Sequence, residues 1–366
     1  MKIECIKDKL VEGINKADRL TGKNLSLPIL SCIYIKASKN SIIIRATNLD
    51  CGIEVTIPAK VLEEGEIALY GGVLNSLLSG LPREKNITLE TKDGNILVST
   101  NSNNTLIKTF SPEDFPSIPK LETQKTIEIN PKTLIKGFKS VVYSASVSTI
   151  KPELASVYVY KSGSDLVFVS TDSFRLAEKK VKIKETLDFP SVIIPSKNVL
   201  DIIKSLEGVT DDIQVLFDNN QIAFETNSMY LMSRVVDATF PDYKQIIPKA
   251  FVTEVIVLKQ DFVDSLKTSN VFSDKFNQVN IKALPSKKTF VVSTKNSDIG
   301  EYTNTIDTSV TGEDVDINFN YRYIADCFQS IDADSLSLSI GGSNKPLVIH
   351  GVSDNSFMYL VMPMNR

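Results

Sequence analysis

The fold is decided by one stretch near the middle of the chain, Leu166-Val167-Phe168-Val169-Ser170-Thr171-Asp172-Ser173-Phe174-Arg175-Leu176-Ala177. It begins with an apolar run, and a second, alternating run follows at Lys179–Ile183. A hydroxyl, a carboxylate and a guanidinium lie close together in this stretch, so a catalytic role is one interpretation. The plainer interpretation is a strand, a tight polar turn and a second strand. The rest of the chain decides between them.

The apolar run and its threonine occur three times. Ile42–Thr47 and Thr289–Thr294 repeat the pattern of Leu166–Thr171, and the threonines are 124 and 123 residues apart. Self-similarity at a fixed period is the signature of a repeat architecture. A propeller or a solenoid is the alternative, but propeller blades recur at roughly 40–50 residues, a much shorter period than this one.

A predicted hairpin closes each third of the chain. Ile87–Ser102 and Ile213–Ser228 each place apolar runs on both sides of a polar turn, and Leu336–Asn355 is a looser copy around Gly341-Gly342. Asx-Gly and Gly-Gly turns between such runs are strong hairpin signals. We therefore expect three β-rich copies of one unit.

Two short helical patterns accompany the strands of each third. Their ranges are Lys7–Ala17, Gly72–Leu81, Pro131–Val142, Ser196–Leu206, Lys259–Lys267 and Tyr321–Ile331. Asn130 is a plausible N-cap with Pro131 at the first helical position, and Ser196 can cap the next helix. Gly208 follows the end of that helix, as is common for a C-terminal cap.

Two proline-containing segments separate the thirds. They are Ser111–Pro116 and Phe240–Tyr243, and their prolines cannot continue a central strand. We therefore predict an α+β protein made of three copies of one unit, each a β-layer with two helices. The predicted domains are 1–123, 124–248 and 249–366.

The inventory of reactive residues is poor for an enzyme. The single histidine, His350, lies in an apolar strand-like segment, and no nucleophile-elbow or phosphate-loop motif occurs. The four cysteines are scattered without a Cys-x-x-Cys pair, which argues against a zinc or redox site. We expect no catalytic residue, no metal and no cofactor.

The N-terminal segment points to a cytoplasmic chain. Met1–Asp8 carries charges where a signal peptide needs an apolar core. No apolar run approaches the roughly 18 residues of a membrane span. We expect no membrane partner.

The charge is balanced overall, but lysines gather on helix faces. Residues 1–123 and 124–248 each hold 15 basic and 15 acidic side chains, so the net charge of −3 falls in the last third. Sequence-specific nucleic-acid binders usually show a basic excess, which is absent here. At helical periodicity, lysines share one face in three predicted helices: Lys9 and Lys16; Lys132, Lys136 and Lys139; Lys197 and Lys204. One such face is ordinarily just solvated, but its recurrence favours a common surface that attracts phosphate without reading sequence.

Together these features resemble the bacterial DNA polymerase III beta subunit, the sliding-clamp family. The resemblance covers the full length and rests on Leu27–Leu30, Gly80–Pro82, Asp114–Pro116, Thr171–Ala177, Phe240–Tyr243 and Val361–Met364. It implies a head-to-tail homodimer whose three-domain chains close a six-domain ring around duplex DNA, with helices lining the hole. It also implies a processivity factor without catalytic activity of its own, which works in the cytoplasm at the nucleoid.

The resemblance further implies a peptide-binding pocket between the second and third domains. Its walls would be Leu154, Thr171, Ser173, Phe174, Arg175, Leu176, Pro241, Ile246, Asn320, Tyr323, Leu360, Met362, Pro363 and Met364. Apolar side chains and methionines suit a site that accepts many short peptides, because Met repacks readily. The implied partners are the alpha subunit of the replicative polymerase, the clamp loader and repair polymerases. A final buried strand over Tyr359–Met364 is the alternative.

Two further surfaces follow from the resemblance. The DNA-facing residues would be Lys9, Lys16, Lys23, Lys132, Lys136, Lys139, Lys197 and Lys204. The dimer contact would join Leu106 and Lys108 of one chain to Val271, Phe272, Asp298 and Glu301 of the other. Lys108 replaces an expected apolar residue and would pair with the acids.

Departures from the family pattern affect the pocket. Ser173 and Phe174 stand where many members have Gly or Asn and His or Tyr, which makes the rim more apolar. Lys151 stands where an arginine is common, so a planar bidentate contact is lost there.

Three other classes of function fit the sequence less well. A scaffold with the clamp fold would bind peptides and have no role on DNA, and the lysine faces discriminate against it. A hydrolase is disfavoured by the missing motifs and the single histidine. A trimeric clamp of two-domain chains is excluded by the number of repeats.

Overall fold

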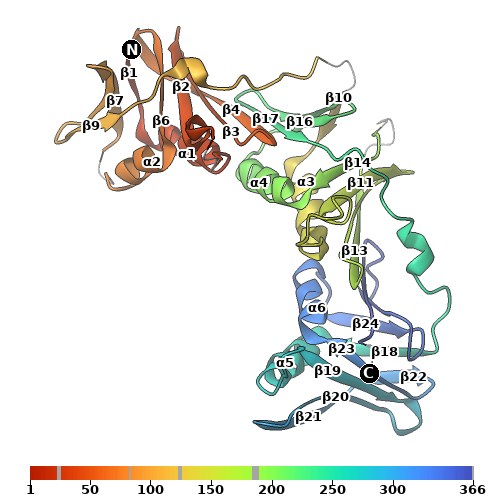
Figure 1. Cartoon of the computed structure of the whole chain (residues 1–366). Coiled ribbons are helices and arrows are strands. Elements are labelled where there is room, and N and C mark those ends of the chain that lie inside the picture. Colours follow the sequence, from red (N-terminus) through yellow and green to blue (C-terminus); the bar gives the residue numbers. More distant parts are fainter. Residues whose placement is uncertain (23–25, 82–83, 123–125, 184–188, 365–366) are drawn as a thin grey trace. The chain divides into compact units, whose positions relative to one another are not determined.

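The computed structural model describes all residues except 23–25, 82–83, 123–125, 184–188 and 365–366. The chain divides into two compact units (Figure 1). Unit 1 holds Met1–Lys132 with Lys197–Asp237, and unit 2 holds Thr133–Ser196 with Ala238–Arg366. The three sequence repeats are called the first, middle and third repeat below. Their predicted boundaries, after residues 123 and 248, stay a prediction.

Within the described ranges, the six predicted helices are present. They are α1 Lys7–Asp18, α2 Gly71–Ser79, α3 Pro131–Val141, α4 Ser196–Leu206, α5 Lys259–Asn270 and α6 Tyr321–Asp326. The last is shorter than predicted, because its final turn, Cys327–Ser330, is a 3₁₀ helix.

Unit 1 contains two sheets. One has the strand order β5-β1-β7-β8-β9 and the other β10-β15-β16-β17-β4-β3-β2-β6. The strands are β1 Lys2–Ile6, β2 Cys32–Ser38, β3 Ser41–Thr47, β4 Cys51–Pro58, β5 Lys60–Glu63, β6 Gly65–Tyr70, β7 Asn86–Lys92, β8 Asn95–Ser99, β9 Asn104–Lys108, β10 Thr126–Ile129, β15 Ile213–Phe217, β16 Gln221–Glu225 and β17 Met229–Arg234. The predicted Asp93-Gly94 turn joins β7 to β8, and both residues have positive φ, 48° and 70°, which a two-residue hairpin turn of this kind requires.

Unit 2 also contains two sheets. Their orders are β14-β11-β12-β13-β26-β25-β24-β18-β22 and β21-β20-β19-β23. The strands are β11 Ser156–Ser162, β12 Asp165–Thr171, β13 Arg175–Lys182, β14 Val192–Pro195, β18 Thr253–Leu258, β19 Gln278–Leu284, β20 Thr289–Asn296, β21 Gly300–Ile306, β22 Ser309–Gly312, β23 Val315–Asn320, β24 Ser335–Ile340, β25 Leu347–Gly351 and β26 Phe357–Val361.

Neighbouring repeats share a sheet. In unit 1 the last strand of the middle repeat, β17, pairs with β4 of the first repeat. In unit 2 the last strand of the third repeat, β26, pairs with β13 of the middle repeat. The middle repeat is therefore divided between the units, which explains why three repeats give two compact bodies.

The helices pack closely on the sheets because a small residue stands at the same point in each repeat. The seventh residues of α1, α3 and α5 are Gly13, Gly137 and Ser265. A Cβ on Gly13 would overlap the Ile57 side chain, and one on Gly137 would overlap the Phe168 ring. The Phe168 ring packs edge-on against Phe138, with centroids 5.1 Å apart. The helix backbones therefore approach the sheets more closely than a larger residue would permit.

Candidate functional site

The stretch Thr171–Arg175 is the turn between β12 and β13, as the plain interpretation predicted. The Thr171 hydroxyl donates to the Arg175 carbonyl at 2.6 Å. The Asp172 carboxylate accepts from the amides of Phe174 and Arg175 at 2.9 and 3.0 Å. Ser173 adopts a left-handed φ of 77°. These are the local hydrogen bonds by which Asp and Thr stabilise turns.

The first repeat builds the same turn at Thr47–Cys51. The Thr47 hydroxyl donates to the Cys51 carbonyl at 2.7 Å, and Asn48 accepts from the amides of Asp50 and Cys51 at 3.0 and 2.7 Å. Leu49 has a φ of 75°. The turn therefore belongs to the fold, and what distinguishes the middle repeat is Phe174 and Arg175, which replace Asp50 and Cys51.

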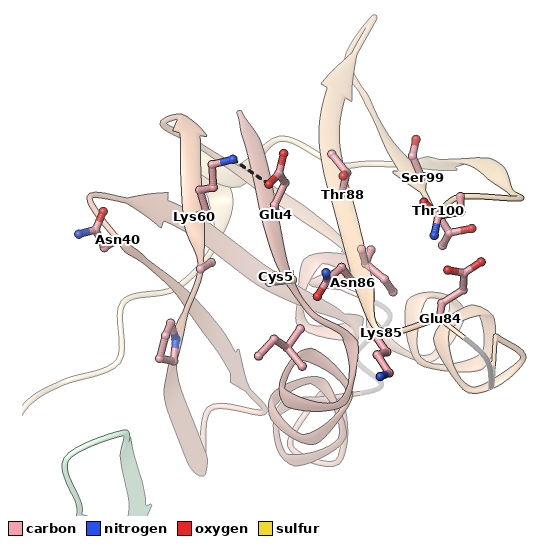
Figure 2. A pocket seen from close by; sticks show the side chains of 15 residues that line it. Glu4, Cys5, Asn40, Lys60, Glu84, Lys85, Asn86, Thr88, Ser99 and Thr100 are labelled. Atoms are coloured by element: carbon pink, nitrogen blue, oxygen red, sulfur yellow. Dashed lines mark hydrogen bonds and ion pairs between the residues drawn. The ribbon is translucent and has the colours of Figure 1, made fainter.

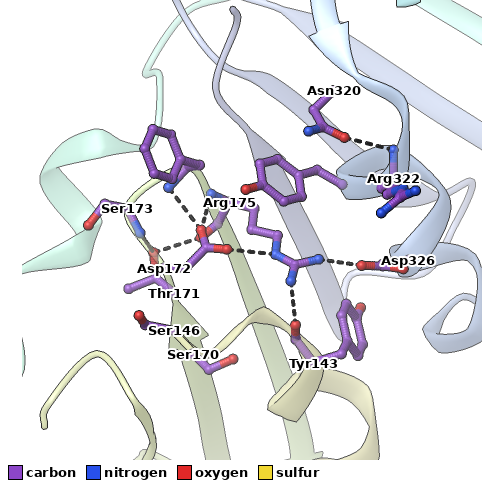
Figure 3. Close-up of polar contacts among 12 residues, drawn as sticks. Tyr143, Ser146, Ser170, Thr171, Asp172, Ser173, Arg175, Asn320, Arg322 and Asp326 are labelled. Atoms are coloured by element: carbon purple, nitrogen blue, oxygen red, sulfur yellow. Dashed lines mark hydrogen bonds and ion pairs between the residues drawn. The ribbon is translucent and has the colours of Figure 1, made fainter. Parts of the chain in front are cut away.

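The Arg175 side chain is held from three sides within unit 2 (Figure 3). Its Nε donates to Asp172 at 2.9 Å, one terminal nitrogen donates to the Tyr143 carbonyl at 2.7 Å, and the other donates to Asp326. The guanidinium also lies 4.7 Å from the Tyr323 ring centroid, a favourable cation–π distance. Arg175 thus ties the middle repeat to α6 of the third repeat. Sequence reasoning missed Tyr143 and Asp326, because they lie 32 and 151 residues from Arg175.

Beside this arginine lies an exposed apolar and aromatic surface. The Phe174 side chain is 60% exposed, and its ring is roughly parallel to that of Tyr323, with centroids 6.4 Å apart. The Phe174 carbonyl accepts from the Met362 amide at 2.8 Å, which brings the chain after β26 alongside the turn. Met362, Pro363 and Met364 are partly exposed.

The fourteen predicted pocket residues all belong to unit 2. Leu154, Thr171, Leu176 and Leu360 are buried, and Leu176 pairs with Leu360 across β13 and β26. Tyr359 and Leu360 belong to β26, a largely buried strand, while Met362–Met364 lie beyond it. The alternative of a final buried strand therefore holds only as far as Val361.

Other predicted pocket residues are placed less directly. Asn320 caps α6 by accepting from the Arg322 amide at 3.0 Å (Figure 3). Pro241 and Ile246 are exposed on the segment that leads into the third repeat. Val147 and Ile150, which are among the most exposed apolar residues of the chain, lie in the loop before Leu154. Neither residue is among the predicted pocket residues, because their serine-rich surroundings give only a loop signal.

The predicted DNA-facing lysines differ in their surroundings. Lys9 and Lys16 both pair with Glu12, at 3.9 and 3.0 Å, and Lys136 pairs with Asp332 at 2.7 Å. Lys132, Lys139, Lys197 and Lys204 are exposed. Lys23 lies outside the described residues. The ion pairs reduce the charge that three of these lysines offer to phosphate.

A basic cluster surrounds α4 in unit 1. Burial raises the pKa of Asp201, and the charges of Lys204, Lys197 and Arg19 oppose that rise. Arg19 follows α1 and was missed, because the lysine pattern ended at Lys16. The cluster places three cations around one carboxylate.

The predicted dimer residues lie on or near strand edges. Leu106, 53% exposed, and Lys108 belong to β9, the edge strand of its sheet in unit 1. Glu301 belongs to β21, an edge strand of unit 2, and Asp298 precedes it in an exposed turn. The Phe272 ring stacks on Tyr302 of β21, with centroids 6.3 Å apart and planes 4° apart. Val271 is exposed beside it.

Metal-ligating side chains, helix length and one cavity were compared with the requirements of other functions. No group of three or more His, Cys, Asp or Glu in the described ranges is arranged to hold a metal ion, and no described helix is long and apolar enough to span a membrane. A cavity of about 1000 Å³ in unit 1 is lined mainly by polar residues, and its side chains include the Glu4–Lys60 ion pair at 3.0 Å (Figure 2). Burial raises the pKa of the Cys5 thiol at this cavity to about 12, so this cysteine is a poor nucleophile.

The fold and the junctions between repeats define a class of protein, the three-domain clamp. Two solved clamps superpose over the whole chain: the DNA polymerase III beta subunit of Thermotoga maritima, with a TM-score of 0.94 and 26% identity, and the Bacillus subtilis sliding clamp, with 0.93 and 24%. Both comparisons cover 100% of this chain and 99% of the solved chain.

Sequence comparison gives the family. Residues 1–119, 128–242 and 244–365 match the N-terminal, central and C-terminal domains of the DNA polymerase III beta subunit. The chain belongs to this family. Beta sliding clamps of Synechococcus elongatus and Staphylococcus epidermidis are 25% and 24% identical to it, over 100% of this chain and 99% of theirs.

Proposed function

We infer that this chain is a DNA sliding clamp: a processivity factor, without catalytic activity of its own, that encircles duplex DNA and tethers replication and repair proteins. The observation that carries this function is the repeated strand junction. Each junction inside the chain pairs the last strand of one repeat with the fourth strand of the repeat before it. By the same pairing, β9, the last strand of the first repeat, and β21, the fourth strand of the third repeat, would each pair with a strand of another copy of the chain.

A second copy of the chain would supply the partner strands for β9 and β21. The repeat threonines Thr47 and Thr171 lie opposite Gly52 and Leu176, which pair with Met232 and Leu360 at the two junctions. Thr294 lies opposite Tyr302 in the third repeat. The position in β9 that corresponds to Met232 is Leu106, because β16–β17 and β8–β9 share one register at an offset of 126 residues.

Leu106 of one copy is therefore expected opposite Tyr302 of the other. Two such contacts close a head-to-tail homodimer, which covers both strand edges and removes their aggregation hazard. The exposed Leu106 would meet the stacked Phe272 and Tyr302, and Lys108 would lie opposite Gly300, the residue before Glu301. Leu106→Cys with Tyr302→Cys should give a covalent dimer on oxidation, of twice the 40.5 kDa chain mass. A monomer in native mass measurement, with no crosslinking, would contradict the ring.

The exposed lysines of α3 and α4 support binding to DNA. Lysine contacts to phosphate are independent of sequence and weaken as salt rises. A topologically linked ring nevertheless stays on DNA at high salt. Protein loaded on a circular duplex should therefore resist high salt and leave when the circle is cut. Salt-driven release from an intact circle would exclude topological linking.

The partners that dock on the Phe174 surface are proposed to be short apolar peptide segments of the replicative polymerase alpha subunit, the clamp loader and repair polymerases. Methionine and aromatic side chains supply adaptable apolar contacts. The chain is proposed to act in the cytoplasm at the nucleoid. A peptide-binding scaffold without a role on DNA is the second candidate, and the same surface favours it. It predicts no retention on circular DNA.

A further inference from the structure

We propose that Glu178 is a positioning residue of the peptide-binding site. Its buried carboxylate fastens the segment that links the middle and third repeats, residues 236–249, and so fixes where Pro241 and Ile246 stand. The inference rests on the proposed peptide-binding function. It is carried by contacts in unit 2, and the same arrangement occurs independently in unit 1.

In unit 2 the linker is fastened through one tyrosine. Glu178 lies on β13 and is 7% exposed. The Tyr243 hydroxyl donates to its carboxylate, and the hydroxyls of Tyr243 and Tyr160 are 2.8 Å apart. The Lys180 ammonium lies 3.2 Å from Glu178, so the charge is compensated. A buried carboxylate with these partners holds a hydrogen bond stronger than one between neutral groups.

Aromatic contacts align the same linker on the sheet. The Phe240 ring stacks on Tyr158, with centroids 4.8 Å apart and planes 12° apart. The Lys244 ammonium lies 5.5 Å from the Tyr160 ring centroid. Burial and, to a smaller extent, the hydrogen bonds to Glu178 and Tyr160 raise the pKa of Tyr243 well above its usual value. The phenol therefore remains a hydrogen-bond donor at physiological pH.

In unit 1 a buried glutamate at the equivalent position also fastens a linker, but through a lysine in place of a tyrosine. Glu54 occupies the position equivalent to Glu178, because Arg45↔Glu54 and Val169↔Glu178 are paired two residues before Thr47 and Thr171. The linker after the first repeat supplies Lys120, whose ammonium lies 3.0 Å from Glu54.

The aromatic contact also recurs in unit 1. Phe115 of the linker packs on Tyr34, with ring centroids 5.3 Å apart. Tyr34 and Tyr158 differ by 124 residues, the spacing of the repeat threonines. The two linkers share a Phe-Pro pair and an Ile-Pro-Lys end, and each is fastened, through a different residue, to a carboxylate at one position of the fold. In the third repeat the equivalent position is Asn304, opposite Val292, which carries no charge.

The link to the peptide site is short. Tyr243 is the first residue of a 3₁₀ turn that ends at Ile246, and its amide donates to the Pro241 carbonyl at 2.7 Å. One anchored residue therefore lies between the two exposed linker residues predicted to line the site. Loss of the anchor should free both of them, so the peptide would then have to order the linker when it binds.

The experiment compares Glu178→Ala, Glu178→Gln and Tyr243→Phe with a matched control, Glu54→Ala. The probe is a synthetic peptide with the C-terminal sequence of a bacterial replicative polymerase, titrated by fluorescence anisotropy. Hydrogen exchange of residues 239–247 reports the linker directly. Glu178→Ala and Tyr243→Phe should weaken binding about tenfold, the equivalent of one charged hydrogen bond, and should speed exchange of the linker. Glu178→Gln keeps an acceptor and should restore most of the affinity.

The Glu54→Ala control distinguishes loss of linker positioning from a general loss of stability of the protein. Glu54→Ala should speed exchange only around Lys120 and leave peptide affinity unchanged. Unchanged affinity of Tyr243→Phe, with faster linker exchange, would overturn the positioning role. Equal weakening by Glu54→Ala would also overturn it. If the wild-type protein binds no peptide, the proposed function fails instead.

Discussion

Removal of the Arg175 guanidinium should loosen the attachment of the third repeat to the middle repeat. Arg175→Met keeps the length and apolar stem of the side chain and removes three hydrogen bonds. The Arg175 side chain is 11% exposed, whereas Asp326 is 43% exposed. Asp326 can therefore rehydrate, and its pair is worth at most about 1 kcal/mol. Asp172 is nearly buried and keeps two amide donors, so its lost partner costs about 2 kcal/mol.

The loss of stability in Arg175→Met should be detected in β26, the strand that pairs with Arg175. Arg175 lies opposite Val361 of β26, and the Met362 amide bonds to Phe174. A local loss of about 2 kcal/mol raises the open population roughly 30-fold, so amide exchange of residues 357–364 should accelerate by about that factor. Arg322→Met, at an exposed position of α6, is the control and should change little. Unchanged exchange of residues 357–364 in Arg175→Met would refute the role of Arg175 in this attachment. A larger effect of Asp326→Asn than of Asp172→Asn would refute the division of the cost between the two carboxylates.

Four other outcomes are expected. Deletion of Met362–Arg366 should abolish binding of the polymerase peptide while native mass still gives a dimer; unchanged affinity would remove these residues from the site. Charge reversal by Lys197→Glu with Lys204→Glu should impair loading onto circular DNA, measured by gel filtration, and spare peptide binding. Gly137→Val should destabilise unit 2 by about 3 kcal/mol or more, because its side chain would overlap the Phe168 ring; an unaltered urea midpoint would contradict the close packing. Burial raises the pKa of Glu54, but hydrogen bonds from Lys120 and Arg45 outweigh burial and hold the pKa below its usual 4.5. Ionised Glu54 therefore stabilises the fold above about pH 4.5, and this stabilisation is lost as the pH falls through the lowered pKa. Glu54→Gln should flatten the acid side of a profile of unfolding free energy against pH.

The repeat and its elements could be predicted because they depend on local signals. Six helices were placed from periodicity and caps, and the hairpins from turns such as Asp93-Gly94. The sharing of sheets by neighbouring repeats could not be predicted from local signals, because strand pairs such as β17 with β4 join residues about 180 positions apart.

The candidate site was predictable in part. Thr171 and Asp172 follow a turn pattern, and Phe174 departs from the family in a recognisable way. The partners of Arg175 and the role of Glu178 depend on side chains brought together by the tertiary fold. A buried Glu in an alternating strand gives no sign in sequence of the linker tyrosine it accepts from.

The division of the middle repeat has a consequence for biosynthesis. Unit 1 needs β15–β17, which end at Arg234, although Thr133–Ser196 belongs to unit 2. A nascent chain therefore leaves the β4 edge uncovered until more than a hundred further residues have emerged from the ribosome. We expect a fragment cut after the first repeat to expose that edge and to be captured by chaperones more readily than one cut near residue 237.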